Sequence, residues 1–85
     1  MGRSARAIPK RLGEKLKQIR LNLGIETYDE MIRKLDCPEL SLHPSGIFLF
    51  ESNKREPTLK VLLRYARLGK VSVEALIDDE LEIGE

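Results

Sequence analysis

The chain has 85 residues, of which 41% are hydrophobic and 34% are charged. This length allows one small domain, and this composition is typical of a folded domain rather than a disordered segment. No apolar run is long enough to cross a membrane, and the N-terminus lacks the apolar core of a signal peptide. We therefore expect a cytoplasmic protein without a membrane partner.

Few side chains in this sequence could support catalysis. Cys37 is the only cysteine and His43 the only histidine, so an intrachain disulfide is excluded and no set of residues has the spacing of a metal site. No nucleophile has an obvious base, and no glycine-rich phosphate loop is present. We therefore expect no enzymatic activity, no cofactor, no metal and no small-molecule substrate.

The charged residues are distributed unevenly along the chain, although the net charge is only +1. Residues 1–20 carry many basic side chains against Glu14 alone, and residues 74–85 carry acidic side chains without a base. We interpret 1–8 as a flexible basic arm, 9–77 as the folded domain and 78–85 as an acidic C-terminal tail. This asymmetry favours an anionic partner at one end. The alternative is that both ends are merely solvated.

Two helices are predicted in the first half of the chain. Pro9 suits the first position of a helix, and Gly24 suits its end. Apolar residues recur at helical spacing on one side of this helix: Leu12, Leu16, Ile19 and Leu23. The basic residues Lys10, Arg11, Lys15 and Lys17 lie off that side. Thr27 and Glu30 form a capping box that begins a second helix, which Pro38 stops.

A third, short helix is predicted after a turn over residues 36–43. Pro44 suits its first position, and Asn53 can adopt the left-handed conformation that ends it. Pro57 or Thr58 begins a fourth helix, and Ser72 caps a fifth. The predicted inward-facing residues are Leu59, Leu62, Leu63 and Ala66 in the fourth helix and Val73, Leu76 and Ile77 in the fifth. Gly69 is expected to make the turn between them.

The third helix and the loop after it carry a family resemblance. The pattern Ile47-x-x-Phe50-Glu51-x-Asn53-Lys54-Arg55-Glu56-Pro57 resembles the recognition helix and following loop of Cro/cI-type helix-turn-helix proteins, the XRE family. Residues 71–77 resemble the closing segment of that family. The resemblance covers residues 10–77 and implies an all-α, five-helix, lambda-repressor-like helix-turn-helix domain.

The resemblance implies roles for individual residues. Arg20 and Glu51 match a partly buried ion pair that locks the recognition helix against the scaffold. Major-groove readout falls to the first turns of the third helix, while loops and helix ends contact the DNA backbone. The implied DNA-binding set is Tyr28, Pro44, Ser45, Gly46, Phe48, Leu49, Lys54 and Arg55, with Arg3 and Arg6 of the arm.

The base-reading face is poor in hydrogen-bond donors, because Ser45 is its only side chain with one. Three interpretations of Phe48 and Leu49 follow. They could read thymine methyl groups, they could form an apolar docking surface for a protein partner, or the long turn before the helix could rotate Phe48 into the core.

The first functional hypothesis is a DNA-binding transcription regulator, a repressor that reads double-stranded DNA with helix 44–52. We expect a homodimer, since this fold reads two half-sites about one helical turn apart. The expected dimer interface consists of Leu76, Ile77, Leu81 and Ile83. The alternative is a protein-interaction module on the same fold, antitoxin-like or a regulatory adaptor, that uses exposed Phe48 and Leu49.

Overall fold

The computed structural model describes residues 7–83, and in that range it contains five α-helices, one short 3-10 helix and no strand. The helices are α1 (Leu12–Asn22), α2 (Tyr28–Leu35), η1 (Pro38–Leu40, the 3-10 helix), α3 (Pro44–Glu51), α4 (Leu59–Gly69) and α5 (Val73–Ile77). The prediction of an all-α protein with five helices is confirmed for this part of the chain. None of these helices is long and apolar enough to span a bilayer.

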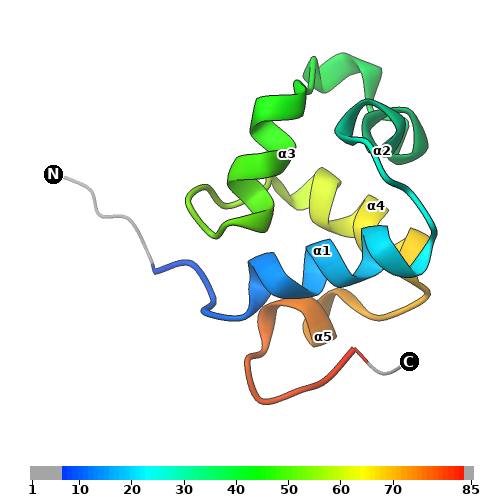
Figure 1. The fold of residues 1–85 in the computed structure, drawn as a ribbon. Coiled ribbons are helices and arrows are strands. Elements are labelled where there is room, and N and C mark those ends of the chain that lie inside the picture. The colour runs from blue at the N-terminus through cyan, green and yellow to red at the C-terminus, as the bar shows by residue number, and fades with distance from the viewer. Residues whose placement is uncertain (1–6, 84–85) are drawn as a thin grey trace, which may run out of the picture.

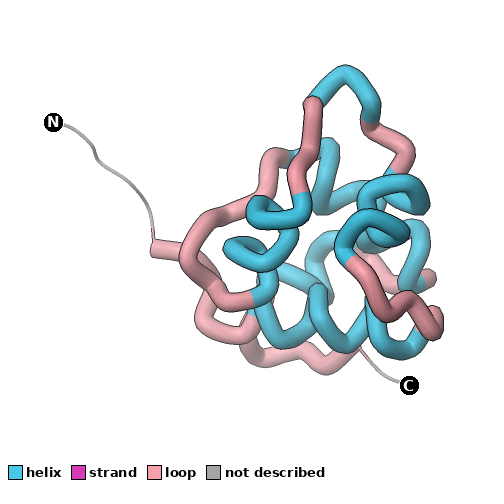
Figure 2. The backbone as a smooth tube through the Cα atoms, turned by 45° about the horizontal axis from the view of Figure 1, so that its top comes forward, coloured by secondary structure: helices cyan, strands magenta, loops and turns pink. Residues whose placement is uncertain are grey.

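Helix α1 lies at the centre of the molecule. It contacts α3, α4 and α5, and α2 packs against α3 and α4. Figure 1 shows α1 crossing the molecule with α3 above it and α5 below it, and Figure 2 shows the helices grouped together with the loops on the outside. The space between the helices is filled by a single buried cluster: Leu12, Leu16, Ile19, Ile25, Met31, Leu35, Ile47, Phe50, Val61, Leu62, Tyr65, Ala66 and Leu76.

The caps predicted for α2 and α5 are confirmed. The Thr27 hydroxyl accepts a hydrogen bond from the Glu30 N–H at 3.1 Å, and the Ser72 hydroxyl accepts one from the Ala75 N–H at 3.0 Å. Each bond satisfies a backbone donor that has no partner within the helix. Gly24, with φ +76°, follows the end of α1 as its position in the sequence predicts.

Helix α1 begins later than Pro9 predicts. The chain first makes a turn in which the Leu12 N–H donates to the Pro9 carbonyl, and the helix starts at Leu12. No nearby side chain caps this end. Instead, the Asp79 carboxylate accepts hydrogen bonds of 2.9 Å from the backbone N–H groups of Lys10 and Arg11. A distant segment therefore defines where α1 begins, and local sequence signals cannot report it.

Lys15 was predicted to lie off the buried face of α1, but in the structure it is buried. It is only 2% exposed, and its ammonium donates to the carbonyls of Ala75 at 2.7 Å and Asp78 at 2.8 Å. These carbonyls lie at the C-terminal end of α5, where a positive charge is favourable. Leu23, predicted to lie on the apolar face, is 43% exposed just beyond the last turn of α1.

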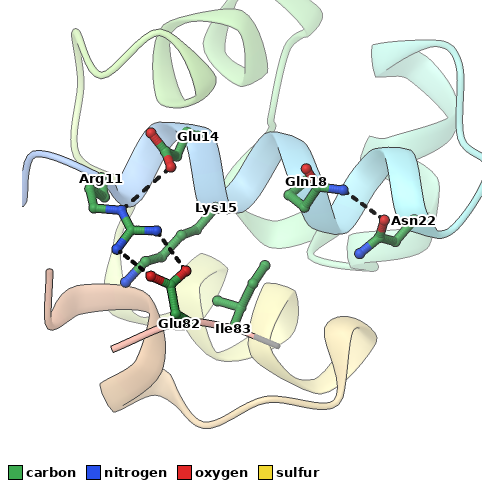
Figure 3. Close-up of a pocket in the computed structure, with 7 residues that line it drawn as sticks. All are labelled: Arg11, Glu14, Lys15, Gln18, Asn22, Glu82 and Ile83. Carbon is green, nitrogen blue, oxygen red and sulfur yellow. Dashed lines mark hydrogen bonds and ion pairs between the residues drawn. The ribbon is translucent and has the colours of Figure 1, made fainter. Parts of the chain in front are cut away.

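The segment after α5, which the sequence assigned to an acidic tail, packs on α1. Arg11 donates two hydrogen bonds to Glu82, at 2.8 and 3.1 Å. Figure 3 shows this contact, with Ile83 lying beneath α1. At the other end of the domain, Ile8 of the predicted arm packs partly buried against the core. Residues 1–6 of that arm lie outside the described part of the chain.

The four residues predicted for the dimer interface differ in burial. Leu76 is fully buried in its own subunit, at 0% exposure, and Ile83 packs against the core. Leu76 therefore has no surface to offer a partner, while Ile83 is partly buried. Ile77 and Leu81 do remain accessible, with exposures of 44% and 38%.

Helix α4 is rotated relative to its predicted apolar stripe. Its buried side chains are Val61, Leu62, Tyr65 and Ala66, while Leu59 is 76% and Leu63 38% exposed. Its C-terminal turn also differs from the prediction. Lys70 itself adopts the left-handed conformation, with φ +58°. Gly69 is the last helical residue, where an added Cβ would lie 2.8 Å from the Ile19 side chain.

Candidate nucleic-acid interface

An ion pair holds the C-terminal end of α3 against α1. The Arg20 Nε donates to Glu51 Oε2 at 2.7 Å, and Nη2 donates to Oε1 at 3.1 Å. The remaining guanidinium nitrogen, Nη1, donates to the Ile25 carbonyl at 3.0 Å. The two charged side chains are 7% and 4% exposed. This two-bond arrangement joins the residues that the family resemblance pairs, and it fixes the orientation of α3 relative to α1.

Two tyrosines lie close to this ion pair. The Tyr28 ring stands over the Arg20 guanidinium at 5.1 Å from its centroid, a favourable cation–π contact. Tyr28 is half-buried, so part of its surface supports the anchor of α3. The Tyr65 hydroxyl is buried and has no hydrogen-bond partner among residues 7–83. Burial raises the pKa of Tyr65, so this group stays neutral and adds no charge beside Glu51.

Asn53 provides a second anchor just after α3. Its backbone adopts the predicted left-handed conformation, with φ +63°. Its side chain accepts a hydrogen bond from the Gly13 N–H at 2.9 Å and donates to the Pro9 carbonyl at 3.0 Å. Gly13 allows this approach because a Cβ there would lie 2.7 Å from the Glu51 carbonyl oxygen. Sequence reasoning missed this contact, although Asn at a left-handed position and Gly inside a helix are both signals of close backbone packing.

One side of α3 is buried and the other is accessible. Ile47 and Phe50 belong to the core, at 0% and 6% exposure, while Phe48 is 49% exposed. The interpretation that places Phe48 in the core is therefore wrong. The remaining residues of the predicted reading face also have accessible surface: Pro44 and Ser45 are exposed, and Gly46 and Leu49 are intermediate.

Two cations follow directly on this accessible stripe. Lys54 and Arg55 are exposed, and their backbone N–H groups both donate to the Leu49 carbonyl, at 2.9 and 3.3 Å. These bonds fold the loop back onto the end of α3. Neither side chain forms an ion pair with another described residue. Arg3 and Arg6, predicted to contact DNA from the arm, lie outside the described residues.

A hollow lies on the side of α1 that faces away from α3, and most of its polar side chains are paired with one another. It is lined by Arg11, Glu14, Lys15, Gln18, Asn22, Glu82 and Ile83. Figure 3 shows that its polar groups bond one another: Arg11 reaches Glu14 and Glu82, and Gln18 donates to Asn22 at 2.8 Å. Within residues 7–83 no cluster of His, Cys, Asp and Glu could hold a metal ion.

The chain was compared with known proteins at the level of families, individual sequences and structures. No family model, curated protein or solved structure matches it at a significant level.

Proposed function

We propose that this protein is a DNA-binding transcription regulator, a repressor of the helix-turn-helix type that places α3 in the major groove. The proposal is based on three features that occur together at α3. An accessible stripe lies on a helix that is fixed to the scaffold at its C-terminal end, and two exposed cations without ion-pair partners among the described residues follow directly.

The relation of α2 to α3 supports this proposal. The two helices pack against each other and are joined by residues 36–43, which contain η1. In a helix-turn-helix, the first helix of such a pair crosses the DNA backbone while the second enters the groove. Figure 1 shows α3 at the edge of the molecule, with α2 beside it and α1 below its C-terminal end.

Phosphate contacts would supply most of the affinity in this arrangement. Lys54 and Arg55 extend from a loop whose path is fixed by the Asn53 side chain, so their backbone positions are set before DNA binds. Arg3 and Arg6 are proposed as further contacts from the arm, and Tyr28 and Ser45 as hydroxyl donors.

Arg55→Ala tests the proposal through the salt dependence of binding. Removing one phosphate contact should weaken binding to all duplexes alike and lower the slope of log affinity against log salt by about 0.9. Arg67→Ala is the matched control, because Arg67 is an exposed arginine on α4; it should leave both quantities unchanged. A Lys54→Ala/Arg55→Ala double variant with the wild-type slope would contradict the proposal.

The exposure of Phe48 favours a second candidate function. An aromatic ring that is 49% exposed at the middle of a helix is also suited to a protein interface. Under that function the protein is an interaction module, antitoxin-like or a regulatory adaptor. Phe48→Asp would then abolish a co-purifying complex while leaving the circular dichroism spectrum unchanged. Retention of the complex by this variant would reject the second function.

The proposal includes a homodimer, since two copies would read two half-sites. Of the residues first assigned to its interface, Ile77 and Leu81 are accessible. Sedimentation should then give twice the monomer mass, and Leu81→Asp should give the monomer. A monomer at high concentration for the unaltered chain would exclude the dimer.

A further inference from the structure

The accessible side of α3 combines an exposed aromatic ring with a shortage of hydrogen-bond donors. We propose that Phe48 reads the C5 methyl group of a pyrimidine in the major groove, either thymine or 5-methylcytosine. This inference rests on the proposed DNA-binding function and adds the chemical feature that the helix recognises. The hydrogen-bonding edges of the bases would then contribute little to specificity at that position.

The side chains of the stripe support this choice. Phe48 follows Pro44 by four positions and Ser45 by three, and Leu49 follows Ser45 by four, so these residues share one side of the helix. Only Ser45 among them has a donor. The next hydroxyl along the stripe, on Ser52, is turned back on the helix, where it donates to the Phe48 carbonyl at 2.8 Å. A surface of this kind lacks the Arg, Lys, Asn or Gln that normally forms two hydrogen bonds with a purine.

The side of α3 that carries Phe48 is set by the packing of the rest of the helix. Ile47 and Phe50 are buried in the core on the opposite side of the same helix, and Glu51 is held by Arg20. The side of α3 that carries Phe48 is therefore fixed outward.

Charge favours DNA over an apolar protein as the occupant of this surface. The stripe ends at Lys54 and Arg55, which are exposed and form no ion pair with described residues. Cations next to an apolar group suit a ligand that offers phosphates beside a methyl group. A hydrophobic protein segment would instead leave these two charges without a complementary partner.

The test uses the full chain and a duplex obtained by selection from random sequences. Each thymine is replaced in turn by deoxyuridine, which removes only the C5 methyl group. The unaltered protein should bind about three- to fivefold more weakly at one position of each half-site, the effect expected for one buried methyl group. Phe48→Ala should bind thymine and deoxyuridine duplexes equally, and its circular dichroism spectrum should show that the fold is kept.

A second set of duplexes separates the methyl group from the rest of the thymine–adenine pair. At the sensitive position the pair is changed to cytosine–guanine, which should weaken binding, and then to 5-methylcytosine–guanine, which should restore it. Failure of the added methyl group to restore binding would overturn the inference, because the protein would then read another feature of the pair.

The remaining outcomes separate the inference from the proposed function. Salt-sensitive, selective binding that ignores deoxyuridine at every position would overturn the methyl reading and leave DNA binding intact. A deoxyuridine effect that persists in Phe48→Ala would assign the contact to another residue and so overturn the role of Phe48. If selection enriched no duplex, both the methyl reading and the proposed DNA binding would be overturned. The exposed Phe48 ring would then favour the protein-interaction function.

Discussion

The basic residues on the two sides of helix α1 differ in what they bind. On the side of α5 and the C-terminal segment, the chain binds its own cations: Arg11 pairs with Glu82, and Lys15 donates to the Ala75 and Asp78 carbonyls. On the side of α3, Lys54 and Arg55 extend into solvent without an ion-pair partner among the described residues. The basic character of residues 10–20 therefore serves folding to a large extent. Lys54 and Arg55, which the proposed function assigns to phosphate contacts, lie outside this basic stretch.

The largest expected effect comes from breaking the anchor of α3. Glu51→Gln removes the charge that balances Arg20 at a site where the two side chains are 7% and 4% exposed. An uncompensated buried charge should lower the free energy of unfolding by about 3–5 kcal/mol. This is a large part of the roughly 4–13 kcal/mol expected for a domain of this size. Urea denaturation measures the loss.

A double variant provides the control for this prediction. Arg20→Met/Glu51→Leu removes both charges together and should recover most of the lost stability, since apolar replacements of buried pairs are often neutral. Equal losses in the single and double variants would show that the side chains contribute through packing rather than through their charges.

A smaller effect is expected where α1 meets the end of α3. Gly13→Ala places a methyl group 2.7 Å from the Glu51 carbonyl oxygen, so the two backbones must separate. We expect a loss of about 1–3 kcal/mol, as for other overpacked sites. Gly46→Ala is a matched control because a Cβ there meets nothing within 4 Å. It should raise stability by about 0.5–1 kcal/mol through helix propensity. Thermal unfolding measures both effects. If the unfolding temperatures of the two variants shifted in the same direction, the close contact at Gly13 would be contradicted.

The smallest effect is expected at the C-terminal side, where the contacts are solvent-accessible. Hydrogen bonds from the Arg11 and Lys10 backbones lower the pKa of Asp79 from its ordinary value of 3.8, and Arg11 lowers the pKa of Glu82 from 4.5. Because both folded-state pKa values are depressed, these groups stabilise the fold above their unfolded-state pKa values. That contribution is lost as the pH falls through the folded-state values.

This pH dependence can be isolated by comparing two proteins. The difference in unfolding free energy between the unaltered chain and Asp79→Asn/Glu82→Gln should be constant near neutral pH and should shrink as the pH falls below about 4. Other carboxylates titrate in both proteins and cancel in the difference. If the difference in unfolding free energy stayed the same down to about pH 2, Asp79 and Glu82 would not contribute to the loss of stability in acid.

Local signals were enough to predict much of the fold. Thr27 and Ser72 do cap α2 and α5, and Asn53 does end α3 in a left-handed conformation, because each depends on a few adjacent residues. The errors involve contacts between distant segments. A lysine at position 15 carries no sign that two carbonyls some sixty residues later will surround it. Helical spacing likewise predicted that Leu59 faces inward on α4, whereas packing against the other helices leaves it exposed.

The candidate site was predictable in part for the same reason. Two of the three interpretations of Phe48 left it accessible, as it is in the structure, where Ile47 and Phe50 form the buried side of α3. The Asn53 and Gly13 contact could not be predicted, because it depends on how closely two helices approach. The pairing of Arg20 with Glu51 came from the family pattern, since two charges 31 residues apart show no periodicity.

The most direct test of DNA binding is selection from random duplexes at two salt concentrations, with the dissociation constant of the best sequence measured at both. We predict an enriched site with two related half-sites, each containing a pyrimidine methyl group, and affinity that falls steeply as salt increases. No enrichment, together with weak or absent binding at both salt concentrations, would contradict it and would assign the exposed side of α3 to a protein partner.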